Sequence, residues 1–181
     1  MAEEARLEET PSGLAPASDG WFVVNVGDTA WMSHPTFGAA CRFESPEAPF
    51  SSYGMNIRVL QPGQPNALYH SEASQEDFLV LVGECALLVE GEERPLKAWD
   101  FVHCPPNVEH IFVGAGDGPC VILMVGARAK DHGLRYPVSE LAGGHGASAE
   151  LETTSAQEAY ASYERPEPGR PDGWEGLPWS G

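Results

Sequence analysis

The stretch that decides the fold is LYHSEASQEDFLVLVG, residues 68–83. His70 and Glu72 stand two residues apart, so on a strand their side chains project from the same face. Glu76 follows after the short polar turn at residues 73–75 and opens an apolar run that ends at Gly83. We therefore expect the imidazole and the two carboxylates to converge.

A second stretch, VHCPPNVEHIFV at residues 102–113, supplies a partner for the first. After its Pro-Pro-Asn turn, a strand begins at His110, which lets this imidazole approach from across a barrel. Two imidazoles and two carboxylates that meet in an apolar, strand-lined cavity form a donor set for a divalent transition metal. The predicted ligands are His70, Glu72, Glu76 and His110.

Around these stretches, residues 21–127 consist of short β-branched and aromatic runs broken by Gly, Pro and Asp. Runs of this length at roughly ten-residue spacing predict an all-β sandwich or barrel. The polar, glycine-bearing connections at residues 89–93 and 114–119 are typical of hairpins. The four cysteines form no CxxC pair, so we expect buried free thiols.

The flanks differ in composition from this domain. Residues 1–20 mix acidic residues with Pro, Ser and Ala without a sustained period, which predicts a disordered acidic arm. Residues 128–181 form a mostly irregular extension with one short helix at about residues 154–163, capped by Thr154 or Ser155. Its Trp- and Pro-rich end, with Trp174 and Trp179, predicts a strap that docks on the barrel or on a dimer partner.

The charge balance excludes some partners. The chain has 10 Lys and Arg against 27 Asp and Glu, a net charge of −17. Binding to nucleic acid or to an anionic membrane surface needs a basic stripe instead. The longest uncharged apolar run, residues 120–127, is too short to cross a bilayer, and residues 1–20 lack the basic and apolar regions of a signal peptide. We expect a cytoplasmic protein.

Residues 63–126 resemble the cupin superfamily. From His70 to Gly83 the spacing follows the first cupin motif, with Glu72 in place of its second histidine. The second motif keeps its proline at Pro105 and its metal histidine at His110. Asn107 replaces a turn glycine and tolerates a positive φ, whereas Trp99 in place of another glycine predicts a locally different hairpin.

The resemblance implies a double-stranded β-helix, a jelly-roll-like barrel that holds a small molecule and a metal near its mouth. It also implies a homodimer. Two carboxylate ligands favour Fe(II) or Mn(II), with Zn or Ni as alternatives. Glu72 has a second interpretation as an unligated general base above a three-ligand site.

Further candidates come from strand positions. His103 is either a catalytic group lining the cavity or an outward-facing, hydrogen-bonded histidine. Asn56 and Arg58 share a strand face, and Tyr69 flanks His70, so these three are candidate substrate-binding residues. An inward arginine would bind a carboxylate or enolate, and the alternative is an ion pair at the barrel rim. His34, His132 and His145 are expected at the surface.

Three functions fit these residues. The first is a mononuclear-metal enzyme acting on a small oxygen-rich molecule as a dioxygenase, decarboxylase or isomerase, with an oxidoreductase favoured. The second is a non-catalytic module that binds a small ligand or sugar. The third is a structural barrel with a vestigial site that holds no metal.

Overall fold

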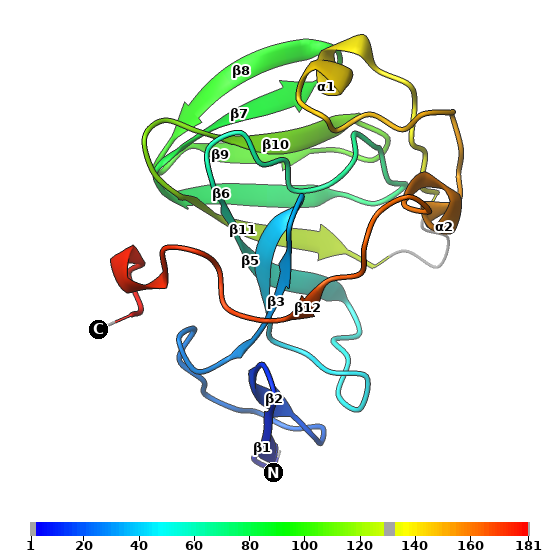
Figure 1. Cartoon of the computed structure of the whole chain (residues 1–181). Helices are drawn as coiled ribbons and strands as arrows, with labels where there is room; N and C mark the ends of the chain where they lie inside the picture. The colour runs from blue at the N-terminus through cyan, green and yellow to red at the C-terminus, as the bar shows by residue number, and fades with distance from the viewer. Residues whose placement is uncertain (1–2, 129–132, 181) are drawn as a thin grey trace.

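Two antiparallel sheets pack against each other in the computed structural model, which describes residues 3–128 and 133–180 (Figure 1). Six strands of the larger sheet are β3 (Ala30–His34), β4 (Gly38–Arg42), β5 (Tyr53–Leu60), β6 (Glu76–Val82), β9 (Phe101–Cys104) and β11 (Cys120–Ala127). The short strand β12 (Glu167–Pro168) completes it in the order β12-β3-β4-β5-β11-β6-β9. The smaller sheet has the order β10-β7-β8, from β7 (Glu84–Val89), β8 (Glu92–Lys97) and β10 (His110–Ala115).

The main core lies between the two sheets. Phe78 and Val80 of β6 and Ile122 of β11 face Leu87 of β7 and Phe112 of β10 across it. Alternation along each strand sends these apolar side chains inward. The expected all-β, cupin-type barrel is therefore confirmed.

The backbone conformation at the turns matches the expectation from the sequence at two turns and differs from it at a third. Glu90 and Gly91 join β7 to β8 with φ values of 49° and 78°, as a two-residue hairpin requires. Asn107 has the expected positive φ, at 70°. Trp99, however, has a φ of 76°, so it takes the left-handed conformation of the glycine it replaces, and the expectation of a different hairpin is wrong.

The acidic N-terminal segment is ordered, which corrects the prediction of a disordered arm. Strands β1 (Leu7–Thr10) and β2 (Gly13–Pro16) form an antiparallel hairpin. The amide of Leu14 donates to the carbonyl of Asp28 at 2.7 Å, and Ala5 is bound in the same way by Trp21 at 2.8 Å. The segment is held by backbone pairing with the start of the barrel, and composition gives no sign of such pairing.

The C-terminal extension wraps the barrel (Figure 1). It contains α1 (Glu140–Gly144), which the sequence did not indicate, α2 (Ala156–Ala159), and the 3-10 turn η1 (Trp174–Gly176). Ser155 caps α2, as one of the two expected residues. The strap docks on its own barrel: Trp174 and Trp179 pack on Trp31 with ring centroids 5.7 and 5.4 Å apart.

The four cysteines are buried and free, as expected. Within the described residues, none of the helices has the length and apolar character needed to cross a bilayer.

Candidate metal centre and cavity

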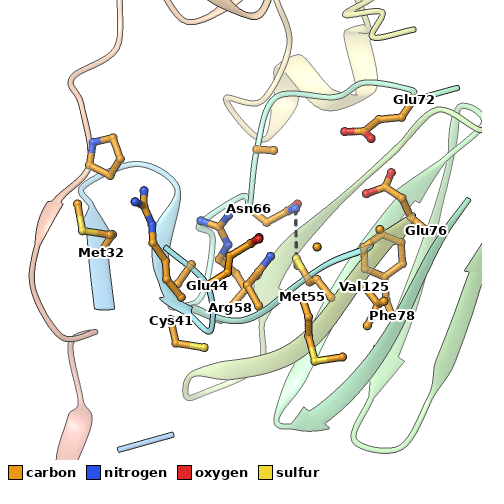
Figure 2. A pocket seen from close by; sticks show the side chains of 18 of the residues that line it. Met32, Cys41, Glu44, Met55, Arg58, Asn66, Glu72, Glu76, Phe78 and Val125 are labelled. Carbon is orange, nitrogen blue, oxygen red and sulfur yellow. Dashed lines mark hydrogen bonds between the residues drawn. The ribbon is translucent and has the colours of Figure 1, made fainter. Parts of the chain in front are cut away.

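A cavity of about 800 Å³ opens on the inner face of the larger sheet. His70, Glu72, Glu76 and His110 all line it. Figure 2 shows Glu72 and Glu76 with their carboxylates turned toward one another at one end, and Arg58 and Asn66 farther along the same cavity. The four predicted ligands are therefore brought to one place.

The backbone fixes which nitrogen each histidine offers. His70 and His110 face each other across an antiparallel bridge, and the His110 amide donates to the His70 carbonyl at 2.8 Å. The Nδ1 of His70 lies 2.7 Å from the carbonyl oxygen of Leu68, and the Nδ1 of His110 lies 3.0 Å from that of Val108. Because a carbonyl only accepts, both Nδ1 atoms carry the proton and both Nε2 atoms keep a lone pair.

These lone pairs point at carboxylates. The Nε2 of His70 is 3.9 Å from Oε1 of Glu72, and the Nε2 of His110 is 3.4 Å from Oε2 of Glu76. One possible metal-ligand atom each from His70, Glu72 and Glu76 lies within 4.8 Å of the other two. These atoms are all hydrogen-bond acceptors, and acceptors that converge repel one another unless a cation or a proton lies between them. The residues therefore fit a divalent metal with nitrogen and oxygen ligands.

Burial sets the protonation of these groups. Burial raises the pKa of the Glu76 carboxyl to about 8, and the charge of Glu72 adds to the rise. Burial also lowers the pKa of His110 to about 4, helped by His70, and lowers the pKa of His70. Near neutral pH, the site without a cation therefore holds neutral imidazoles beside a protonated Glu76.

Aromatic side chains hold the ligands in place. Tyr136, from the extension, stacks on His70 with centroids 5.6 Å apart and an interplanar angle of 27°. Phe78 packs against His110 at 5.2 Å. The Asn107 amide donates to the Glu72 carbonyl at 2.6 Å, which ties the Pro-Pro-Asn turn to the segment that carries His70 and Glu72. Sequence reasoning missed Tyr136, since nothing in its local pattern connects it with His70.

The other predicted site residues divide into two groups. Asn56 and Arg58 line the cavity, as expected of substrate contacts. Tyr69 does not: it is buried in a separate cluster with Leu88 and Ile111, and its hydroxyl accepts from the amide of Gly91. Tyr69 is therefore turned away from the cavity that its neighbour His70 lines.

His103 is also placed away from the cavity. Its Nδ1 lies 2.6 Å from Oδ1 of Asp77, and 48% of its side chain is exposed. Strand pairing sets this position, because His103 lies opposite Asp77 in the register and Asp77 faces outward. His34, expected at the surface, is buried instead and bonds the Glu164 carbonyl at 3.0 Å. His145 pairs with the surface residue Glu93, and His132 lies outside the described residues.

A β-barrel with a cluster of His and Glu side chains at one end of its cavity has the architecture of a cupin. The family model of the cupin domain matches residues 56–126. This stretch, a little over a third of the chain, is therefore similar to a cupin domain.

The fold is similar to that of a solved structure. The polyketide cyclase RemF from Streptomyces resistomycificus is 16% identical with a TM-score of 0.52, over 59% of this chain and 79% of that one. A cupin 2 conserved barrel domain protein from Salinispora arenicola is 22% identical with a TM-score of 0.48, over 54% and 82%.

A protein from Acidithiobacillus ferrooxidans described as a sugar phosphate isomerase is 27% identical with a TM-score of 0.46, over 48% of this chain and 57% of that one. The match thus spans less than two thirds of that protein. No curated protein matches the chain.

Proposed function

We propose that this chain is a metal-dependent cupin enzyme that acts on a small, oxygen-rich molecule. The carrying observation is the cluster of His70, Glu72 and Glu76 at one end of the cavity, with the Nε2 of His110 3.4 Å from Oε2 of Glu76. A cavity of about 800 Å³ lies within the range of small-molecule sites. Fe(II) or Mn(II) suits the two carboxylates best, with Zn or Ni as alternatives.

His70, Glu72, Glu76 and His110 would hold the metal, which would supply Lewis acidity and open coordination positions for a substrate oxygen or O₂. The chain's own residues provide the setting. Phe78 and Met124 keep the cavity beside the ligands apolar, which excludes water there. The hydroxyl of Ser74 donates to Oε2 of Glu72 at 3.4 Å and orients this carboxylate, which can also serve as a proton acceptor.

An oxidoreductase of the dioxygenase type is the reaction that we propose first, with decarboxylation and isomerisation as the other cupin chemistries to assay. Elemental mass spectrometry of the purified chain tests the metal. We expect close to one Fe or Mn per chain, and a sharp loss in Glu76→Ala and Glu72→Ala. Retention of metal in Glu72→Ala alone would show that Glu72 is not a required ligand, as the general-base interpretation expects.

The matched control is Asp77→Ala, which removes a carboxylate on the same strand that faces outward to His103. It should keep its metal. O₂ uptake by the metal-loaded chain is then measured with a panel of enols, diketones, catechols and keto acids. Lack of metal in the parent chain, even after incubation with added metal, would refute the proposed metal-dependent activity. Stoichiometric metal without turnover of any substrate would favour the non-catalytic binding module.

A further inference from the structure

Arg58 carries a positive charge in the barrel that no side chain in the described residues neutralises. It lies on β5 between Ile57 and Val59, both buried. Its Nη1 donates to the Phe37 carbonyl at 3.1 Å, while its Nε is enclosed with no hydrogen-bond partner. The ion pairs among the described residues do not include Arg58.

Such a charge is costly to keep in the interior of a protein. A guanidinium is almost always protonated, and Arg58 is only partly exposed, so its charge is poorly solvated until a counter-charge binds. Burial accordingly lowers the pKa of Arg58, and no Asp or Glu is among the groups that counteract this shift. The position of Arg58 therefore calls for an anion from outside the chain.

The groups next to Arg58 are hydrogen-bond donors. Tyr160, from the extension, accepts the Leu68 amide at 2.9 Å through its hydroxyl oxygen, so its own proton remains free to donate. The Oδ1 of Asn66, a residue that lines the cavity, accepts a hydrogen bond from the Phe112 amide at 2.7 Å. Among the described residues, the partner of its Nδ2 amide group is the sulfur of Met124, 4.0 Å away. Donors of this kind with a guanidinium match an oxyanion.

Space for an oxyanion exists on both sides of Arg58. A second cavity of about 520 Å³ lies between the barrel and the extension, lined by Phe37, Tyr160, Tyr163 and Arg165. Arg58, Asn66 and His34 line this cavity and the main one alike. The guanidinium therefore lines two cavities, one that contains the predicted metal ligands and one that is lined partly by the extension.

We propose that Arg58, Asn66 and Tyr160 form a binding site for the carboxylate or phosphate group of a small molecule, built jointly by the barrel and the C-terminal extension. This inference deepens the proposed function, because it makes the substrate an anion whose charged group is held at Arg58 while its oxygen-rich part reaches the metal end of the cavity. Figure 2 shows this placement, with Arg58 and Asn66 apart from Glu72 and Glu76.

The test uses the full chain freed of metal by a chelator, with inorganic phosphate and succinate as probes at constant ionic strength. Calorimetry measures affinity, and the ¹H–¹⁵N signal of the Arg58 Nε–H reports contact. We expect saturable binding of at least one probe with a shift of that signal. Phosphate without succinate would identify a phosphorylated substrate, and the reverse a carboxylic acid.

In Arg58→Gln the affinity should fall roughly 10- to 100-fold, since charge-assisted hydrogen bonds contribute on this scale. Arg58→Lys keeps the charge without the planar fork and should lie between Arg58→Gln and the parent. Tyr160→Phe should weaken binding several-fold. The matched control is Arg94→Gln, which removes a surface arginine of β8 that pairs with Glu92 and should bind like the parent.

Equal affinity in Arg58→Gln and the parent, or lack of saturable binding of both probes, would overturn the site. Circular dichroism of each variant separates loss of the site from loss of the fold. Because the measurement needs no metal, the anion site and the metal enzyme fail independently. Anion binding by a chain that never takes up metal would leave an anion-binding cupin.

Discussion

At the scale of single residues, the candidate metal centre depends on which ring nitrogen of each histidine carries the proton. The carbonyls of Leu68 and Val108 hold the protons of His70 and His110 at Nδ1, so both Nε2 atoms face the carboxylates as acceptors. A glutamate at position 72 can take the place of a histidine because it offers an oxygen within the same cluster, although residues 70–72 lie outside the named strands, unlike the sequence-based expectation.

A pH dependence of stability follows for the chain without metal. The pKa of Glu76 is raised to about 8, so between its ordinary pKa and 8 the folded state holds more protons than the unfolded one. Stability must then fall as pH rises through this window. The lowered pKa values of His70 and His110 act in the opposite direction, but only below the ordinary histidine pKa of about 6.5.

Between pH 6.5 and 8 only the Glu76 effect remains, and we expect a loss of about 2 kcal/mol in the free energy of unfolding. Urea unfolding in the presence of a chelator at the two pH values measures it. Glu76→Gln cannot ionise and should lose the dependence, whereas Asp77→Asn on the outer face should keep it. Equal stability of the parent at the two pH values would show that Glu76 does not hold this proton.

Trp99 carries backbone strain that a substitution can relieve. Its φ of 76° is unfavourable for an L-residue, and 75% of the side chain is exposed, so removing the side chain costs little packing. We expect Trp99→Gly to raise stability by about 0.5 to 1 kcal/mol, the strain relieved less the added entropy of the unfolded chain. Thermal unfolding measures the change. The control Trp21→Gly removes another exposed Trp, with no positive φ to relieve, and should destabilise.

At the scale of elements, the C-terminal strap adds packing that the barrel lacks. Trp31 is fully buried, and it is covered by Trp174 and Trp179. Removing the ring in Trp179→Ala should cost about 2 kcal/mol, less than the full loss of a core aromatic because Trp179 is only partly buried. Urea unfolding of the full chain measures it.

A matched variant separates the ring from its polar atom. The Nε1 of Trp179 is buried and has no hydrogen-bond partner among the residues that the structure describes. Trp179→Phe keeps an aromatic ring on Trp31 and removes this unpaired donor, so it should cost much less than Trp179→Ala. Similar losses in the two variants would mean that the strap is held by contacts other than the indole ring.

The site was predictable where it is local and not where it is assembled from distant segments. Strand periodicity and motif spacing place His70, Glu72, Glu76 and His110, because each lies in a short stretch with its own signal. The same periodicity, applied to Tyr69, already points it away from the cavity. His103 needed the register with Asp77, which sequence alone does not give.

The C-terminal extension shows most clearly which contacts could not be predicted from the sequence. Tyr136 and Tyr160 reach the site from segments with no periodic pattern, and their contacts with His70 and the Leu68 amide exist only in the folded chain. The N-terminal hairpin fails for a related reason, since backbone pairing with Thr29 and Trp21 carries no compositional signal.

At the scale of the whole molecule, charges of both signs line the cavities, with Glu44, Glu72 and Glu76 at the main cavity and Glu164 at the second. Of the 10 Lys and Arg residues, Arg42, Arg58 and Arg128 line the main cavity and Arg165 lines the second. The net charge of −17 repels anions at long range, but salt screens that field over about 8 Å at physiological ionic strength. Arg58 therefore acts at short range, where screening is weak.

The same net charge bears on assembly. A homodimer, which the cupin resemblance implies, would bring two chains of −17 together, so repulsion between them must be offset by the interface or by counterions. We expect a dimer of twice 19.5 kDa whose dissociation constant falls as NaCl is raised from low to physiological concentration. Sedimentation equilibrium at several salt concentrations measures it. A mass of 19.5 kDa at every salt concentration would establish a monomer, and a dimer insensitive to salt would place the acidic groups away from the interface.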